Sequence, residues 1–250
     1  MPRHDCQELF AFVGVCYLPC RGLASPMSKH LIFCAAFAFS LACSVRADLT
    51  IVQRVEGTAQ NGEVTVKIKG DKERIDAPSQ PTRIIDGKTG QMTDLMAERK
   101  SYVQISAAQI KAAAENMNLN ADKNATESKL TPTGKKETIG GYETEEYTYA
   151  TPQFKVSFWV APKYPGVIDI LKQMQAPIAG AWKPSNMGMP DYTDFKGLPM
   201  KTIITVGVNE VVTTIVSVKQ DPISSSEFEI PKDFQPLKQP IQPSSPDATP

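Results

Sequence analysis

Residues 49–69, LTIVQRVEGTAQNGEVTVKIK, decide the fold, because two runs of alternating apolar and polar residues flank a turn signal. The alternating apolar residues are Leu49, Ile51, Val55, Val64, Val66 and Ile68. A period of two places such residues on one face of a β-strand. Asn61-Gly62 between the runs favours a tight hairpin turn. The stretch therefore predicts two antiparallel strands that share one apolar face.

The rest of the chain continues this pattern of short β runs and turn residues. Further strands are expected at residues 74–77, 82–86, 91–95, 100–105, 136–139, 142–149, 154–160, 200–208 and 211–219. Turn residues such as Asp86-Gly87, Gly140-Gly141 and Asn209-Glu210 separate consecutive runs. Short connections join antiparallel strands, whereas parallel strands need long crossovers. The predicted fold class is α+β, with an antiparallel β-sheet.

Two helices are expected beside this sheet. Ser106-Ala107-Ala108-Gln109 fits a capping box, and helical spacing follows in Ile110, Ala113, Ala114 and Met117. Pro165 can open a second helix, whose apolar stripe is Val167, Ile170, Leu171 and Met174. We expect a surface loop at residues 118–134 and an irregular lid or loop at 177–194. Two helices are enough to cover one face of the sheet.

All five cysteines and both histidines precede Asp48, in a segment that has the features of an export signal. Met27 is the expected start, so residues 1–26 would be an over-called start. A short basic stretch and the uncharged run from Leu31 to Val45 follow Met27. Val45-Arg46-Ala47 places small residues where a signal peptidase requires them. We expect cleavage after Ala47 and a periplasmic or secreted protein.

Two alternatives to cleavage are disfavoured. An uncleaved anchor needs about 20 apolar residues to span a bilayer, and the run from Leu31 to Val45 is shorter. A lipoprotein form acylated at Cys43 would need an aliphatic residue where Ser40 stands. No stable transmembrane anchor is therefore expected.

Cleavage would leave a chain without thiol or imidazole groups. Disulfides, cysteine nucleophiles, histidine-based triads and ordinary zinc sites are then excluded. Residues 48–250 contain 23 basic and 25 acidic residues, so no basic excess favours nucleic-acid binding. We expect one domain at residues 48–236. Because residues 231–250 contain six prolines, we expect no core there and a Pro-rich disordered tail at 237–250.

Several short strand signatures carry a resemblance to a known architecture. They are Lys72-Glu73-Arg74-Ile75-Asp76, Ile84-Ile85-Asp86-Gly87, Tyr102-Val103-Gln104-Ile105, Thr138-Ile139-Gly140-Gly141-Tyr142-Glu143-Thr144-Glu145 and Phe228-Glu229-Ile230-Pro231-Lys232-Asp233-Phe234. With this order of elements, residues 48–236 resemble the LolA-like lipoprotein carriers. More narrowly, they are similar to an uncharacterised bacterial exported domain-of-unknown-function family related to those carriers.

That resemblance implies a curved antiparallel half-barrel with two to three helices on its concave side. It also implies a concave cavity that holds a lipid or an acyl chain. No residue of a known carrier's site matches this sequence one-to-one, so the resemblance assigns no site residue.

No motif of an enzyme or of a metal site is convincing. Gly87-Lys88-Thr89 resembles part of a phosphate-binding loop, but Thr82 stands where that loop needs a glycine. Glu143, Glu145 and Glu146 could form an acid–base pair on a strand, although the run is more typical of a solvated strand surface. We predict no catalytic residue, no metal site and no cofactor.

Apolar residues near the second helix suggest where a ligand would bind. The candidate cavity-lining residues are Trp159, Val167, Ile170, Leu171, Met174, Trp182, Met187 and Met189. Methionine adapts its shape to variable apolar ligands. The ordinary interpretation is core packing and loop anchoring. The two interpretations are compatible, because a helix that plugs a half-barrel also lines its cavity.

The sequence thus predicts an exported, non-enzymatic binding protein for a lipid, an acyl chain or another apolar ligand. The alternative is a periplasmic structural or interaction module with a protein partner and no small ligand. A hydrolase using serine, threonine or carboxylates is a third possibility, but no spacing of residues points to one. No nucleic-acid partner is expected.

Overall fold

A computed structural model describes residues 47–57, 61–119, 129–151, 154–178 and 189–237, with side chains omitted for residues 114–119. The expected over-called start at 1–26 and the expected export signal at 27–47, apart from Ala47, lie outside these residues, as does most of the expected tail at 237–250. The side chains of Ala114 and Met117 are also not described. No helix in the described ranges is long and apolar enough to cross a membrane.

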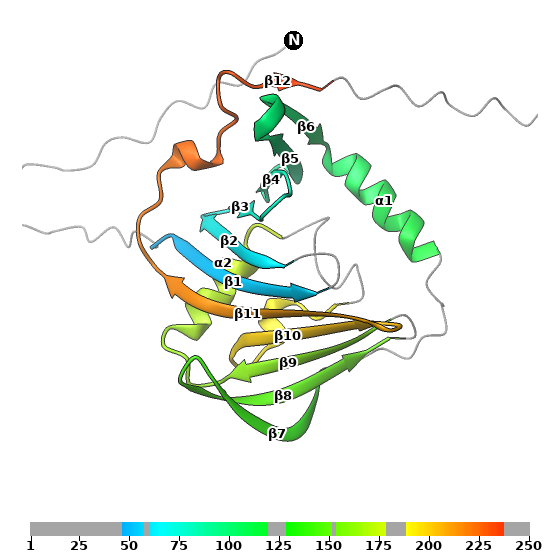
Figure 1. Ribbon diagram of the computed structural model, residues 1–250, viewed down its shortest axis with the longest axis vertical. Helices are drawn as coiled ribbons and strands as arrows, with labels where there is room; N and C mark the ends of the chain where they lie inside the picture. Colours follow the sequence, from blue (N-terminus) through cyan, green and yellow to red (C-terminus); the bar gives the residue numbers. More distant parts are fainter. Residues whose placement is uncertain (1–46, 58–60, 120–128, 152–153, 179–188, 238–250) are drawn as a thin grey trace, which may run out of the picture. The chain divides into compact units, whose positions relative to one another are not determined.

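One open sheet of twelve strands organises the described residues (Figure 1). Its order is β12-β6-β5-β4-β3-β2-β1-β11-β10-β9-β8-β7. The strands are β1 (Leu49–Gly57), β2 (Gly62–Lys69), β3 (Lys72–Asp76), β4 (Thr82–Asp86), β5 (Gln91–Met96), β6 (Ser101–Ile105), β7 (Thr131–Ile139), β8 (Tyr142–Ala150), β9 (Lys155–Ala161), β10 (Leu198–Val206), β11 (Asn209–Lys219) and β12 (Gln235–Pro236). All pairs are antiparallel except β12 with β6. The predicted antiparallel sheet is confirmed.

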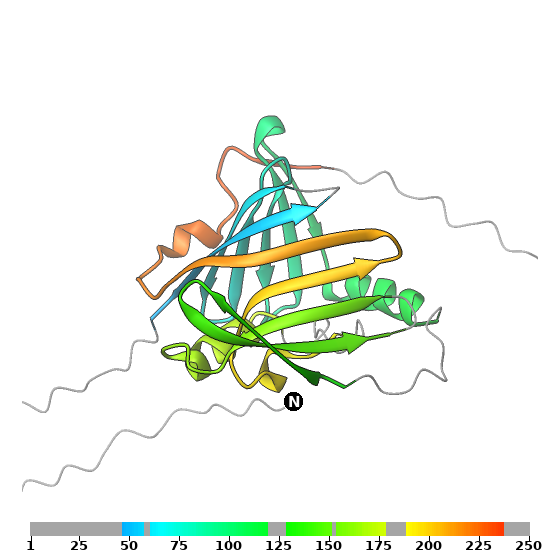
Figure 2. The ribbon, with the colours of Figure 1, turned by 60° about the horizontal axis from the view of Figure 1, so that its bottom comes forward.

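The sheet is strongly twisted and curved, since β3–β6 run in a clearly different direction from β8–β11 (Figure 2). Side chains alternate between its two faces. We call the face that carries Phe158, Val66 and Ile85 the inner face, and the opposite one the outer face. Both α-helices pack on the inner face. The expected fold class, a curved antiparallel sheet with helices on one side, is confirmed.

Helices α1 (Ala107–Leu119) and α2 (Val167–Gln175) cover different parts of the inner face. Ile110 of α1 packs with Ile85, Met92 and Ile105 of β4–β6. The predicted capping box is present, because the Ser106 N–H donates to Gln109 Oε1 and the Gln109 N–H donates to Ser106 Oγ. In α2, Ile170, Leu171 and Met174 are buried in the main core with Val156, Phe158 and Val160 of β9.

The segment 220–237, here called the C-terminal strap, covers the outer face of β3–β6 (Figure 1). Phe228, in the short helix η5 (Ser225–Phe228), packs with Ile84 and Leu95, and Phe234 joins this cluster. Beyond it, the Gln235 N–H donates to the carbonyl of Lys100. The expectation that no core forms after Pro231 is therefore wrong at its first residues. The expectation rested on the number of prolines, but Phe228 and Phe234 of the strap pack on an apolar patch of the sheet.

Three sequence-based boundaries also differ from the structure. β7 begins at Thr131, inside the stretch expected to be a loop, because an edge strand with an exposed surface carries no alternating pattern. The β10–β11 turn consists of residues 207 and 208, since Val206 pairs with Asn209 and Gly207 has a positive φ. Gly62 already lies in β2 opposite Val55, so the first hairpin turn precedes it.

Candidate functional site

Strand pairing aligns apolar side chains across the inner face of β1, β2 and β3. Val64 of β2 lies opposite Gln53 of β1, and Val66 lies between Ile51 of β1 and Ile75 of β3. Residues directly opposite each other in antiparallel strands point to the same face. These rows make an apolar floor next to α2.

Three adjoining hollows lie along this floor, and together we call them the inner groove. The middle hollow, of about 220 Å³, shares Gln53, Met174 and Tyr192 with a second of about 260 Å³. It shares Val64 and Ile75 with a third of about 430 Å³. The combined volume of any two adjoining hollows falls within the roughly 300–1,000 Å³ that is usual for small-molecule sites. The groove is therefore large enough for an extended chain.

Helix α2 and the short helix η4 (Tyr192–Asp194) provide the wall of the groove. The backbone N–H of Tyr192 donates to Gln175 Oε1 of α2 at 2.9 Å. A capping box between Asp191 and Asp194 fixes the start of η4. These contacts hold the Tyr192 side chain against Met174, at the junction of two hollows.

Glu73 is the charged residue of the middle hollow. It lies on the inner face of β3 between Ile68 of β2 and Ile85 of β4. Burial raises the pKa of its carboxyl from 4.5 to about 7, because the charged form loses hydration. Within the described part of the chain, its side chain has no hydrogen bond or ion pair.

Tyr192 contributes a hydroxyl to the same hollow. Burial, with a smaller contribution from the charge of Glu73, raises the pKa of Tyr192 to about 12. The phenol therefore stays protonated at physiological pH. Glu73 and Tyr192 give the apolar hollow one polar end.

An ion pair lies at the far end of the groove. Arg83 lines the third hollow, and its Nε and Nη2 donate to the two carboxylate oxygens of Asp94 at 2.8 and 3.0 Å. The hydrogen bond that Arg83 donates to Asp94 raises the pKa of Arg83. Both charges are thus satisfied by each other. No group of three or more potential metal-ligating side chains occurs in the ranges that the structure covers.

The structure places the predicted lining residues in four different settings. Met174 and Met189 line the groove. Ile170 and Leu171 are buried in the core, and Val167 packs against it. Trp182 and Met187 lie outside the described residues.

Trp159 faces away from the groove. It pairs with Glu146 and Lys201, whereas its neighbour Phe158 points to the inner face. Lys201 Nζ lies 4.9 Å from the centre of the Trp159 ring. The assignment of Trp159 to the cavity wall is wrong by one strand position, because adjacent residues of a strand point to opposite faces.

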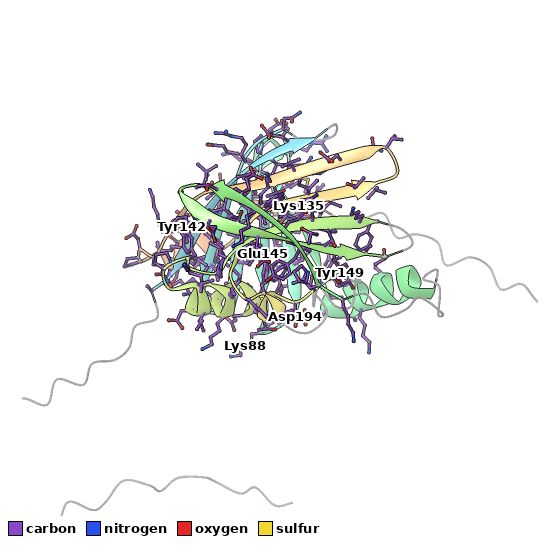
Figure 3. All side chains as sticks on the ribbon, turned by 90° about the horizontal axis from the view of Figure 1, so that it is seen from below. Lys88, Lys135, Tyr142, Glu145, Tyr149 and Asp194 are labelled. Carbon is purple, nitrogen blue, oxygen red and sulfur yellow. The ribbon has the colours of Figure 1, made fainter. Side chains whose placement is uncertain are left out.

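Each of the three glutamates of β8 has a polar partner other than another glutamate. Glu143 pairs with Lys136, and Glu145 accepts a hydrogen bond from the Tyr147 hydroxyl. Figure 3 labels Glu145 on β8. Glu146 is buried, not solvated, because residues 133–135 of β7 bulge out where the register shifts and meet it. Thr133 Oγ1 donates to Glu146 at 2.8 Å, and Lys135 lies 3.2 Å from it.

The sequence-based prediction missed Glu73, Tyr192 and Gln53. The sequence does indicate the position of Glu73: it lies two residues before Ile75 on the same strand, so both side chains point to the inner face. The Lys72–Asp76 stretch served only as evidence for a strand. Tyr192 lies in an irregular segment, where no periodicity shows which way a side chain points.

Comparisons with known proteins place the chain in a family. A family model described as "Domain of unknown function (DUF4412)" matches residues 49–234. The comparison with curated proteins found no match.

Solved structures show distant similarity. PNGF-II is 13% identical, with 77% of this chain and 32% of that chain covered and a TM-score of 0.39. The lipoprotein LppX of Mycobacterium tuberculosis is 12% identical, with 72% and 90% covered and a TM-score of 0.37. The MucA/MucB complex of Pseudomonas aeruginosa is 7% identical, with 78% and 60% covered and a TM-score of 0.40. The chain spans about a third of the length of PNGF-II.

Proposed function

Since this chain belongs to the DUF4412 family, which is described only as a domain of unknown function, we propose its function from the inner groove: the domain binds the apolar chain of a lipid or a similar amphiphile. The observation that carries this proposal is the row of three adjoining hollows over an apolar floor. Met174 stands at a junction of two of them, where its flexible side chain can adapt to different chains.

Burial of an alkyl chain would supply the affinity. Each methylene removed from water contributes about 0.8 kcal/mol. A chain of about ten methylenes would contribute roughly 8 kcal/mol before the cost of ordering the ligand is subtracted. Micromolar binding corresponds to a net free energy of about 8 kcal/mol, so the affinity for such a chain should be weaker than micromolar once that cost is subtracted.

The proposed role is holding a ligand, without chemistry. Glu73 and Tyr192 mark one polar end, and the rest of the middle hollow, apart from Gln53, is apolar. Such a layout orients an amphiphile by its polar group. The export signal expected at residues 27–47 would place this activity outside the cytoplasm. The alternative of an interaction module without a small ligand stays a prediction.

Probe displacement tests the proposal. The chain from residue 48 onward, purified without detergent, is titrated with N-phenyl-1-naphthylamine, whose fluorescence rises in apolar sites. We expect saturable binding of one probe per chain, and its displacement by dodecanol below the concentration at which dodecanol aggregates. Absence of saturable probe binding would contradict the proposed function.

A further inference from the structure

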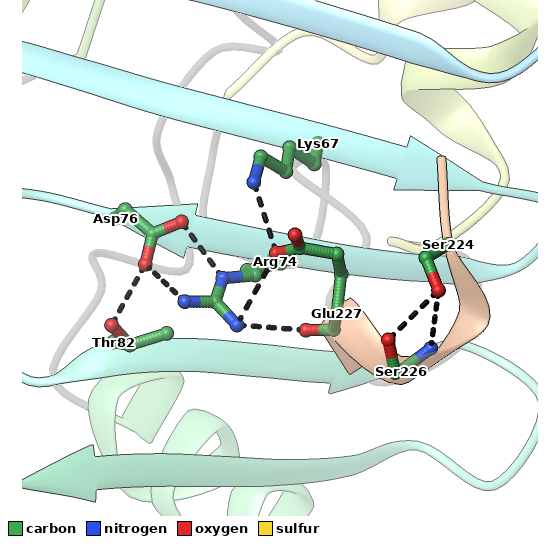
Figure 4. A network of polar contacts seen from close by, with 7 residues as sticks. All are labelled: Lys67, Arg74, Asp76, Thr82, Ser224, Ser226 and Glu227. Carbon is green, nitrogen blue, oxygen red and sulfur yellow. Dashed lines mark hydrogen bonds and ion pairs between the residues drawn. The ribbon is translucent and has the colours of Figure 1, made fainter. Parts of the chain in front are cut away.

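On the inner face of β2–β4 the charged residues are Arg83 and Glu73: Arg83 pairs with Asp94, whereas Glu73 has no hydrogen bond or ion pair within the described residues. Arg74, its neighbour in sequence, points to the outer face and binds Asp76 through Nε and Nη2 (Figure 4). Arg83 on the inner face is held by both oxygens of Asp94. Neither guanidinium is therefore available to Glu73.

An unpaired carboxyl in an apolar hollow is costly for a folded protein. A buried charge normally has a partner, because protein atoms do not replace the lost hydration. A glutamine of the same shape would avoid this cost. An unpaired polar group that is destabilised by loss of hydration, and that lines a cavity, is a candidate for binding a ligand.

The residues that line the hollow with Glu73 do not supply a countercharge for its carboxylate. Tyr192 of η4 offers a hydroxyl, and Gln53 of β1 lines the same hollow with an amide. The other lining residues from β1, β2, β3 and α2 are apolar. No cationic side chain lines this hollow, and neither of these neutral groups forms a hydrogen bond with Glu73 within the described residues, so a cationic ligand group would fit beside the carboxylate.

On the basis of the proposed lipid-binding function, we propose that the inner groove selects amphiphiles whose polar end is a protonated amine, with the ammonium next to Glu73 and the chain along the apolar hollows. The ammonium would form a charge-assisted hydrogen bond with the carboxylate. Anionic amphiphiles, such as ionised fatty acids, would be repelled by the same group.

Binding of an amine is then linked to ionisation of Glu73. The pKa of the Glu73 carboxyl is about 7, so the carboxyl is largely neutral at about pH 5.5 and ionised at about pH 8.5. An alkyl ammonium stays charged across this range, since its pKa lies near 10. Amine affinity should therefore rise with pH, and Tyr192 should stay protonated throughout.

The test compares three ligands of equal chain length: dodecylamine, dodecanol and dodecanoate. Each displaces N-phenyl-1-naphthylamine from the wild type, from Glu73→Gln and from Glu63→Gln, at about pH 5.5 and about pH 8.5. Glu63→Gln is the matched control, because Glu63 is exposed on β2 with its side chain on the opposite face. Thermal unfolding of each variant verifies that it is folded.

In the wild type and in Glu63→Gln we expect dodecylamine to bind about tenfold more tightly than dodecanol at the higher pH. This preference should largely disappear at the lower pH and in Glu73→Gln. Equal displacement by all three ligands in every variant would overturn the amine preference while leaving the lipid-binding function intact. An amine preference that persists in Glu73→Gln would also overturn it. Absence of probe binding would contradict the lipid-binding function itself.

Discussion

Lys67 Nζ and Glu227 Oε2 lie 3.0 Å apart, although 160 positions separate the two residues in the chain. This contact joins β2 to the C-terminal strap, and Arg74 Nη1 adds a hydrogen bond to the Glu227 carbonyl at 2.8 Å (Figure 4). The ion pair is partly exposed, and such pairs contribute only about 0–1 kcal/mol. Phe228, the next residue, is buried against Ile84 and Leu95, and we expect its burial to contribute more to holding the strap than the ion pair does.

Replacing Phe228 should therefore cost much more than replacing Glu227. We expect Phe228→Ala to lower the free energy of unfolding by about 3–5 kcal/mol, because it leaves a cavity against Ile84 and Leu95. Glu227→Gln should lower it by about 1 kcal/mol or less. Urea titration measures both values, with the exposed Glu229→Ala as the control. Equal losses for Phe228→Ala and Glu227→Gln would refute this assignment.

Glu73→Gln should stabilise the domain as the pH rises. The folded state raises the carboxyl pKa from 4.5 to about 7, so the stability contribution of Glu73 is complete below about pH 4.5 and is lost as the pH passes through 7. Above about pH 8 the variant should be more stable than the wild type by about 3 kcal/mol.

Urea titrations at about pH 4.5 and about pH 8.5 measure that difference for Glu73→Gln. Glu63→Gln, on the exposed side of β2, should stay within about 0.5 kcal/mol of the wild type at both pH values. A stability difference for Glu73→Gln that does not change with pH would show that folding does not raise the pKa of Glu73.

Gly87→Ala should disturb the end of α2. A Cβ at Gly87 would lie 2.7 Å from the Pro177 carbonyl oxygen and 2.8 Å from the Pro177 Cα, both backbone atoms just after α2. We expect a loss of more than about 2 kcal/mol, together with weaker probe binding, since α2 forms the groove wall. Gly70→Ala is the control: its φ is +61° with nothing within 4 Å of a Cβ, so about 1 kcal/mol is expected. Equal losses in the two variants would contradict the close contact.

Met174→Trp should block the inner groove. Met174 lines two of its hollows, and the larger indole would fill their junction. Probe affinity should fall by at least about tenfold. Ile168→Trp is the matched control, because Ile168 lies on the same helix and is 67% exposed. Unchanged probe affinity in a folded Met174→Trp variant would place the ligand elsewhere.

The strands could be predicted because most of them have one buried face. In β1 and β2 the alternation of Leu49, Ile51, Val64 and Ile68 follows from the period of two. β7 is exposed along most of its length, so its sequence has no alternation of apolar and polar residues that would show its start at Thr131. The strap was expected to belong to the domain, but its place on the sheet could not be predicted, because Phe228 packs with Ile84 and Leu95, which are far from it in the sequence.

The candidate site was harder to predict than the fold. The stripe of α2 indicated Met174 correctly as an inward residue, since helical spacing fixes the face of a helix. Trp159 was expected in the cavity wall, but it is Phe158, the residue before it, that points to the inner face. Glu73 breaks the apolar pattern, and a single charged residue in a strand does not show whether it is unpaired until the neighbouring strands are placed.

Native mass spectrometry of the domain measures whether an amphiphile occupies the inner groove. Wild type, Ile168→Trp and Met174→Trp are exported from a bacterial host, purified without detergent, and measured intact and after lipid extraction. We expect one bound amphiphile per chain in the wild type and in Ile168→Trp, and depleted ligand in Met174→Trp. Chains that are empty in all three proteins and that bind no added amphiphile would contradict it.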